Sequence, residues 1–345
     1  NKDNKSVIGL KTSDISFKGN EWILNKDNDD RNKVEFNKTL DSITIKEVVM
    51  NNGEDEQIRL RGQLADSTYK DLQLQFKIVS LNKITPTIDS LRLDGQVNGI
   101  LNVLQKDNIY LPSSNLNISS FSVNEITLGD MAIGIVGNKD LTNFVVNSQL
   151  VDEGVEKFGI LGNLSTEGEM PVATLIANFN GFNLEPFDPL GGGVISHIRG
   201  GLNGSVKITG EIDNPDITGE LTMNNAGIGV PYLNVDYSFA PNSKVELYNQ
   251  TFHFNNVRLT DVDENTKATI DGDIRHKFFK DWYLDLKVDT KNDRLLILNT
   301  DTEHNEDDLY YGTGFLKGTG KIYGPTQALT IKVNGSTAKG TSLKI

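Results

Sequence analysis

Three stretches of this chain repeat one short pattern, and the pattern is typical of β-strands. In each stretch a glycine is followed by a polar and then an aliphatic residue, at Gly62, Gly162 and Gly272, which are 162 − 62 = 100 and 272 − 162 = 110 positions apart. Apolar-rich strand patterns follow at residues 72–78, 175–179 and 284–288, and a second, glycine-containing pattern recurs at 93–99, 201–208 and 318–324. Self-similarity at a fixed period is typical of proteins in which each unit packs against the next. The chain is therefore predicted to be an extended scaffold of repeats.

The composition favours a sheet with one apolar face over a single compact core. Hydrophobic residues make up 37% of the 345 residues, which is low for one core of that size. Each repeat is therefore expected to spread its apolar residues over one face of a sheet. A partial repeat is predicted at residues 1–85, a second at 86–195, and a third, with one continuous sheet, at 196–345.

Charge and cysteine content exclude several classes of protein. The net charge of −13 argues against nucleic-acid binding, which needs clustered Lys and Arg. The absence of cysteine excludes disulfides, thiolate zinc sites and a cysteine nucleophile. No run of 18 apolar residues is present, so these residues are not expected to span a bilayer as a helix. The polar start at residues 1–5 indicates a fragment of a longer chain.

Alternation of apolar and polar residues dominates the chain and predicts an all-β fold. Val206 and Ile208 alternate with Lys207 and Thr209, and many other stretches show the same period of two. The 32 glycines and the Asn/Asp clusters supply turns, and glycines inside strands fit a strongly curved sheet. Only a few short helices are expected, near residues 83–90 and 186–198, with 295–298 either helix or strand.

Metal sites and bound cofactors are not expected. The four histidines are dispersed, without the spacing of a metal site, at His197, His253, His276 and His304. Asp261, Asp263 and Asn265 resemble the opening of a calcium loop, but Thr266 stands where the loop needs glycine and Gly272 where it needs a bidentate glutamate. A solvated turn is the preferred interpretation there.

Catalysis is not expected either. The glycines at 191–193 lack the Lys-Ser/Thr that would follow in a phosphate-binding loop. No Gly-x-Ser-x-Gly pattern occurs, and no carboxylate is paired with an evident base or nucleophile. The chain is predicted not to be an enzyme.

The candidate functional residues are therefore an apolar lining rather than a catalytic group. The alternation places them on one face of the sheet, and they are Leu72, Leu74, Phe76, Leu175, Phe179, Val206, Ile208, Ile217, Leu221, Leu233, Val235, Tyr237, Phe239, Leu284, Leu286, Leu329, Ile331 and Val333. Charged residues such as Lys207, Glu220 and Asp236 are expected on the convex side. The alternative is that the same apolar side chains meet across a closed sandwich and bury one another.

The final part of the chain, residues 196–345, contains an ordered set of short motifs: Gly-Ser-Val-Lys-Ile at 204–208, Asn-Pro at 214–215, Asp-Gly-Asp-Ile at 271–274, Leu-Asn-Thr at 298–300, Tyr-Gly at 311–312 and Gly-Lys-Ile-Tyr-Gly-Pro at 320–325. In this ordered set, the final part resembles the C-terminal domain of the TamB family, the translocation and assembly module subunit, in a Bacteroidota-like version. Residues 1–195 resemble the family only in being a series of repeated strands, without its specific motifs. The Pro-Leu that usually follows the closing strand is not reached before Ile345.

The resemblance, within the AsmA-like, bridge-like lipid transfer superfamily, implies an open β-groove, or β-taco, in the periplasm. It implies an inner-membrane anchor in an N-terminal segment absent from this chain. It further implies phospholipid as the bound molecule, a BamA-like outer-membrane barrel (TamA or its lipoprotein counterpart) as partner, and a role in lipid transport and outer-membrane biogenesis.

Two alternative functions stay open at this point. A scaffold or chaperone would bind unfolded strands of outer-membrane proteins at exposed sheet edges. A secreted carbohydrate-binding or adhesin array would instead place aromatic side chains on the polar face of the sheet.

Overall fold

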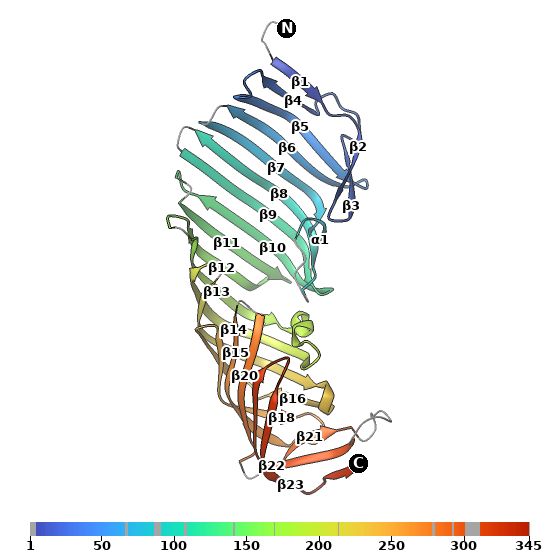
Figure 1. The fold of residues 1–345 in the computed structure, drawn as a ribbon, viewed down its shortest axis with the longest axis vertical. Helices are drawn as coiled ribbons and strands as arrows, with labels where there is room; N and C mark the ends of the chain where they lie inside the picture. The colour runs from blue at the N-terminus through green and yellow to red at the C-terminus, as the bar shows by residue number, and fades with distance from the viewer. Residues whose placement is uncertain are drawn as a thin grey trace. The chain divides into compact units, whose positions relative to one another are not determined.

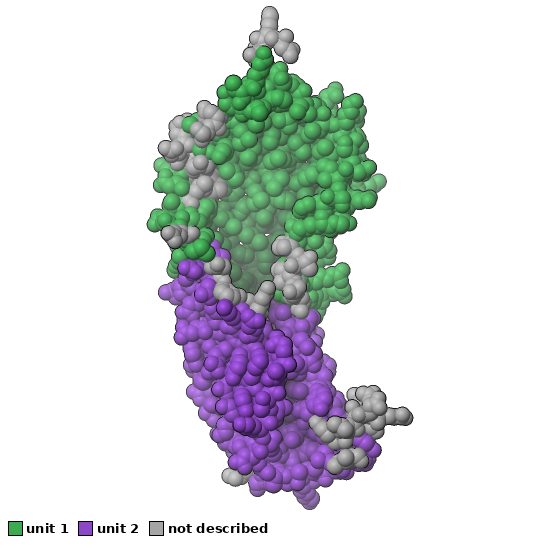
Figure 2. Space-filling view, viewed as in Figure 1, with its two compact units in different colours: residues 1–175 green, residues 176–345 purple. Residues whose placement is uncertain are grey.

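The computed structural model of the protein describes residues 5–65, 68–85, 91–106, 109–140, 142–168, 170–212, 214–277, 280–291, 293–300 and 311–344. The chain divides into two compact units, Asn1–Leu175 and Ile176–Ile345, which are coloured separately in Figure 2. The division into three repeats remains a prediction.

Unit 1 is an antiparallel sheet of sequential hairpins (Figure 1). Its strands are β1 (Lys5–Gly9), β2 (Ser13–Phe17), β3 (Asn20–Leu24), β4 (Lys33–Asn37), β5 (Ser42–Asn52), β6 (Glu56–Ala65), β7 (Tyr69–Ser80), β8 (Leu93–Lys106), β9 (Ile109–Val123), β10 (Ile126–Gly137), β11 (Asn143–Asp152) and β12 (Val155–Ser165). Strands β4 to β12 pair in chain order, β1 pairs with β4, and the β2–β3 hairpin joins through β5. The next strand, β13 (Val172–Asn183), contains the unit boundary.

Unit 2 contains the remaining strands. They are β14 (Ser196–Glu211), β15 (Asp216–Val230), β16 (Val235–Phe239), β17 (Ser243–Tyr248), β18 (Thr251–Asp261), β19 (Lys267–Lys277), β20 (Lys280–Asp289), β21 (Leu295–Asn299), β22 (Tyr311–Pro325), β23 (Thr330–Thr337) and β24 (Ser342–Lys344). Antiparallel pairing follows the order β14–β15–β17–β18–β19–β20–β22–β23. Strand β16 pairs with both β15 and β18, and β21 and β24 pair with the first half of β22.

The all-β prediction with a few short helices is confirmed, although the helices differ from those expected. The described helices are α1 (Leu81–Ile84) and two 3-10 turns, η1 (Glu185–Gly191) and η2 (Pro231–Leu233). A helix up to residue 198 is wrong, because Gly192 and Gly193 turn into left-handed conformations after η1 and β14 follows. Residues 295–298 form strand β21, and residues 86–90 of the other expected helix lie outside the described residues.

The three glycines of the repeated pattern have one structural role. Gly62, Gly162 and Gly272 lie inside strands with φ of +147°, +155° and +125°. A Cβ on them would stand 2.0, 2.2 and 2.1 Å from a carbonyl oxygen of the next strand. Gly62 lies directly opposite Leu72, and Gly272 opposite Leu286. The repeated glycine pattern therefore marks positions where the backbones of two neighbouring strands approach too closely for any side chain.

The core of unit 2 lies on one face of its sheet. Its buried members are Met223, Ala226, Val235, Tyr237, Val257, Leu259, Ala268, Ile270, Leu284, Leu286, Leu295, Leu296 and Phe315. They come from seven strands between β15 and β22, so the sheet closes around them and β21 is buried at the centre. Among the described residues, no helix has the length and apolar character that crossing a membrane requires.

Candidate functional site

The strand register of unit 1 separates an apolar face from a polar one. Leu74 lies opposite Leu60 on β6 and Leu101 on β8, whereas its chain neighbour Gln73 lies opposite Arg61 and Asn102. Following the register from β6 to β12 gives two rows that are mostly apolar. Their ten large apolar side chains, which we call the unit 1 apolar face, are Leu60, Leu74, Leu101, Ile135 and Val146, and beside them Ile58, Phe76, Leu116, Ile133 and Ile160. Ser114 and Gly162 occupy the other positions of the first row, and Gly99 and Ser148 those of the second.

These two rows remain largely half-buried, in contrast to the row beside them. Nine of the ten side chains are neither fully buried nor fully exposed, and only Ile58 is buried. In the adjacent row, Val79, Val97 and Leu150 are at most 2% exposed. Figure 2 shows that one face of unit 1 is hollowed between two raised edges. A half-exposed surface of mostly apolar side chains is typical of binding surfaces.

The predicted lining residues of unit 1 belong to this surface. Leu72, Leu74 and Phe76 project from the same face of β7 and are half-buried. Leu175 stands against Gly162, as Leu72 stands against Gly62. Phe179 lies in unit 2 and packs edge-to-face on Phe182, with ring centroids 5.6 Å apart.

In unit 2 the register also brings the predicted strand residues to one face. Val206 lies opposite Gly219, and Ile208 lies opposite Ile217, so all four residues share one face of the sheet. The strand register extends the same face as far as β23. The predicted residues that share it are Val206, Ile208, Ile217, Leu221, Val235, Tyr237, Phe239, Leu284, Leu286, Ile331 and Val333. Leu233 lies in the turn η2 rather than in a strand, and Leu329 precedes β23, but both pack against the core.

The middle of this face is closed. Val235, Tyr237, Leu284 and Leu286 are at most 9% exposed and pack in the core that includes Leu296 of β21. These four side chains therefore contact protein rather than an open groove, as the closed alternative anticipated. The physical reason is β21, whose apolar residues cover the face.

The ends of the face differ from its middle. Ile208 and Ile217 are half-buried, and Ile331 and Val333 are 59% and 56% exposed. The two β23 side chains are exposed because this strand pairs, among the described residues, with β22 alone.

The charged residues expected on the other side are placed there by the register. Lys207, Glu220 and Asp236 alternate with the apolar positions of their strands. Glu220 pairs with Lys244 at 2.7 Å, and Asp236 with Arg199 at 2.6 Å. This face thus carries the charges that keep the sheet hydrated.

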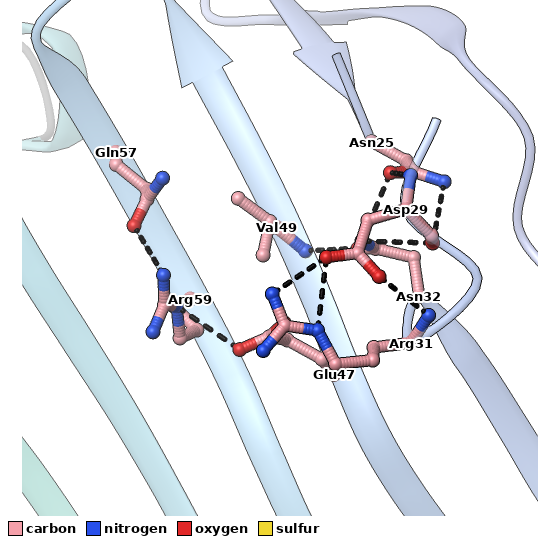
Figure 3. Close-up of polar contacts among 8 residues, drawn as sticks. All are labelled: Asn25, Asp29, Arg31, Asn32, Glu47, Val49, Gln57 and Arg59. Carbon is pink, nitrogen blue, oxygen red and sulfur yellow. Dashed lines mark hydrogen bonds and ion pairs between the residues drawn. The ribbon is translucent and has the colours of Figure 1, made fainter. Parts of the chain in front are cut away.

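Figure 3 shows a cluster of polar and ionic contacts where the β3–β4 connection meets β5. The carboxylate of Glu47 lies 3.2 Å from Arg59 Nε and 3.9 Å from Arg31 Nε. Asn32 accepts a hydrogen bond from the backbone N–H of Val49. These contacts fasten the connection to the sheet. No histidine or hydroxyl nucleophile is among the residues drawn, so the cluster has a structural role.

The calcium-loop candidate is a capped turn. Asp261 is 1% exposed, and its carboxylate accepts hydrogen bonds from the backbone N–H groups of Glu264 at 2.7 Å and Thr266 at 2.6 Å. Its oxygens are thus occupied by the turn between β18 and β19. Within the described ranges, no group of three potential metal ligands occurs.

The histidines stay apart. His197 lies 3.3 Å from Asp236 and His253 2.8 Å from Asp273, both on the charged face. His276 is buried against the rings of Phe252 and Trp282, and burial lowers the pKa of its imidazole. His304 lies outside the described residues.

Sequence reasoning missed eight of the ten residues of the unit 1 apolar face. Leu101, Ile133, Ile135 and Val146 were not among the predicted lining residues, although they continue the rows that begin at Leu74 and Phe76. The alternation Met-Ala-Ile-Gly-Ile at 131–135 is the signal that identifies them.

Repeated antiparallel strands, a half-exposed apolar face in unit 1 and a packed core in unit 2 define this chain as an all-β scaffold that carries an apolar surface. Residues 255–345 match the family model described as the TamB C-terminal domain. This part of the chain is therefore similar to the C-terminal domain of the TamB family, the translocation and assembly module proteins. No curated protein and no solved structure matches the chain. The Bacteroidota-like version remains a prediction.

Proposed function

We propose that this chain shields phospholipid acyl chains on the unit 1 apolar face, as the periplasmic part of an envelope protein that carries lipid from the inner to the outer membrane. The observation that supports the proposal is the half-exposure of two adjacent, mostly apolar rows across β6 to β12. An acyl chain lying there would remove apolar surface from water on both sides, at roughly 0.8 kcal/mol per buried CH₂. Catalysis has no part in this role.

The proposal includes where the protein acts and which protein it binds. The protein would act in the periplasm, anchored in the inner membrane by a segment absent from this chain, and would dock on a BamA-like barrel. The match of residues 255–345 to the TamB C-terminal domain supports both.

The experiment compares lipid binding by two matched variants. Leu74→Glu/Ile135→Glu places two carboxylates on the unit 1 apolar face, and Gln75→Glu/Ala132→Glu places two on the opposite face of the same strands. Native mass spectrometry of the purified chain, incubated with phosphatidylethanolamine and phosphatidylglycerol, should detect phospholipid adducts on the parent and the control. The apolar-face variant should lose them, since a carboxylate among acyl chains is desolvated without a partner.

Two results would contradict the proposal. One is a parent chain that carries no phospholipid, and the other is an apolar-face variant that keeps its adducts while its circular dichroism remains β. In cells, normal lipid delivery by the folded apolar-face variant would favour the second candidate below.

A second candidate function is scaffolding or chaperoning of outer-membrane barrel proteins by edge pairing. All eight residues of β23 are exposed, and within the described chain β23 pairs only with β22. A free antiparallel edge can accept an added strand through main-chain hydrogen bonds. Hydrogen exchange would distinguish the two functions, because a bound peptide should protect β23 amides whereas bound lipid should not.

A further inference from the structure

The C-terminal strands of unit 2 carry a charge opposite to that of the rest of the chain. Residues 311–345 contain five lysines and no Arg, Asp or Glu, so their formal charge is +5. The whole chain carries −13, which leaves −13 − 5 = −18 on residues 1–310. Residues 311–345 are therefore a positively charged segment of an otherwise acidic chain.

The lysines gather on one face of the sheet, opposite the core. Lys287 on β20, Lys321 on β22 and Lys332 on β23 are directly opposite one another in the register. Like charges directly opposite in an antiparallel sheet are destabilising. Lys317 projects from the same face of β22, four residues before Lys321. We call these four side chains the lysine face.

Only part of this positive charge is neutralised within the protein. Lys321 lies 2.9 Å from Asp285, and Lys287 lies 3.5 Å from Asp289. For Lys317 and Lys332, no carboxylate of the described residues lies within ion-pair distance. All four side chains are exposed to solvent.

A tyrosine and a recess accompany the lysines. The ammonium groups of Lys321 and Lys332 lie 5.6 and 5.3 Å from the centre of the Tyr323 ring. An open recess of about 770 Å³ adjoins Lys317, and its lining includes Lys291, Ser336 and the carboxylate-bearing Asp289. The site therefore offers ammonium and hydroxyl donors beside one phenol ring, with one carboxylate in the recess.

We propose that the lysine face binds the phosphate headgroups of an anionic phospholipid bilayer. Lysines attract anionic headgroups, and tyrosines are enriched where hydrocarbon meets water. On β23, Ile331 and Val333 are exposed on the opposite face from Lys332 and do not belong to the lysine face. The proposal does not depend on lipid binding by unit 1.

The test is vesicle flotation with the full 345-residue chain. Vesicles of phosphatidylglycerol and phosphatidylcholine should carry the chain, vesicles of phosphatidylcholine alone should not, and binding should weaken from 50 to 300 mM salt because surface charges are screened. The variant Lys287→Gln/Lys317→Gln/Lys332→Gln should weaken binding about a hundredfold, since each lysine near an anionic surface contributes roughly fivefold.

A matched control removes the same charge elsewhere. Lys157→Gln/Lys207→Gln/Lys244→Gln should bind as the parent does, and circular dichroism should show that all variants keep their strands. Failure to bind anionic vesicles, or an equal loss in the control, would overturn the proposal. So would equal competition by soluble poly-glutamate, which would identify an acidic protein as the partner. Phospholipid adducts detected by mass spectrometry without flotation would refute only this inference.

Discussion

The phenol of Tyr237 donates a hydrogen bond to the backbone carbonyl oxygen of Leu296, 2.8 Å away, and this bond joins β16 to β21 across 59 positions of the chain. Leu296 in turn donates its backbone N–H to the hydroxyl of Thr266, also at 2.8 Å. Both groups of this central strand residue are thereby satisfied inside the core. Burial raises the pKa of the Tyr237 phenol, which therefore remains a donor at every physiological pH.

Removal of that phenol should loosen the closure of unit 2. Tyr237→Phe keeps the ring but leaves the Leu296 carbonyl oxygen without this donor, which should lower the free energy of unfolding by about 1–2 kcal/mol. Urea unfolding monitored by fluorescence measures the change. Tyr232→Phe is the control, since Tyr232 is 75% exposed and should be nearly neutral. Equal stability of the two variants would show that the bond contributes nothing.

The two apolar faces should respond differently to charge. Leu284 is 7% exposed in the packed core, so Leu284→Arg should destabilise unit 2 by at least about 3 kcal/mol because it buries an unpaired cation. Leu74 is half-buried, and Leu74→Glu should cost far less. Thermal unfolding followed by circular dichroism makes the comparison. A fully folded Leu284→Arg chain would contradict the closed core.

The glycines of the repeated pattern should not tolerate a side chain. Gly272→Ala would place a Cβ 2.1 Å from the Asp285 carbonyl oxygen at a φ of +125°, and should cost at least about 2 kcal/mol. Gly320→Ala is the matched control in the same sheet, because a Cβ there meets no atom within 4 Å. Urea midpoints that fall equally for both would show that close approach is not what the repeated glycine provides.

Lowering the pH from about 7.5 to about 5.5 should reduce the free energy of unfolding through His276. Burial lowers the pKa of His276 below its ordinary value, so the unfolded chain takes up a proton at a higher pH than the folded chain does. Stability from this group should be complete above the unfolded pKa of about 6.5 and should fall as pH drops below it, until the folded pKa is passed. Urea unfolding at pH 7.5 and 5.5 measures the difference.

His276→Phe should reduce that pH dependence, because it removes the buried imidazole. A parent chain that is equally stable at both pH values would contradict the prediction.

Alternation along the chain was sufficient to predict which side of a strand each residue occupies. Val206, Leu221, Leu284 and Ile331 were assigned to one face from their period of two, and the register places them there. The glycine pattern likewise predicted a recurrent local feature. Both are properties of a few neighbouring residues, because the backbone of a strand turns each side chain to the opposite side from the last.

Whether an apolar face is open or closed was decided only by tertiary structure. Leu74 and Leu284 lie in similar alternating stretches, yet one is half-exposed and the other is in the core. The difference comes from β21, whose sequence at 295–298 did not distinguish helix from strand. Its burial depends on contacts such as Tyr237 with Leu296, and local periodicity carries no information about partners 59 residues apart.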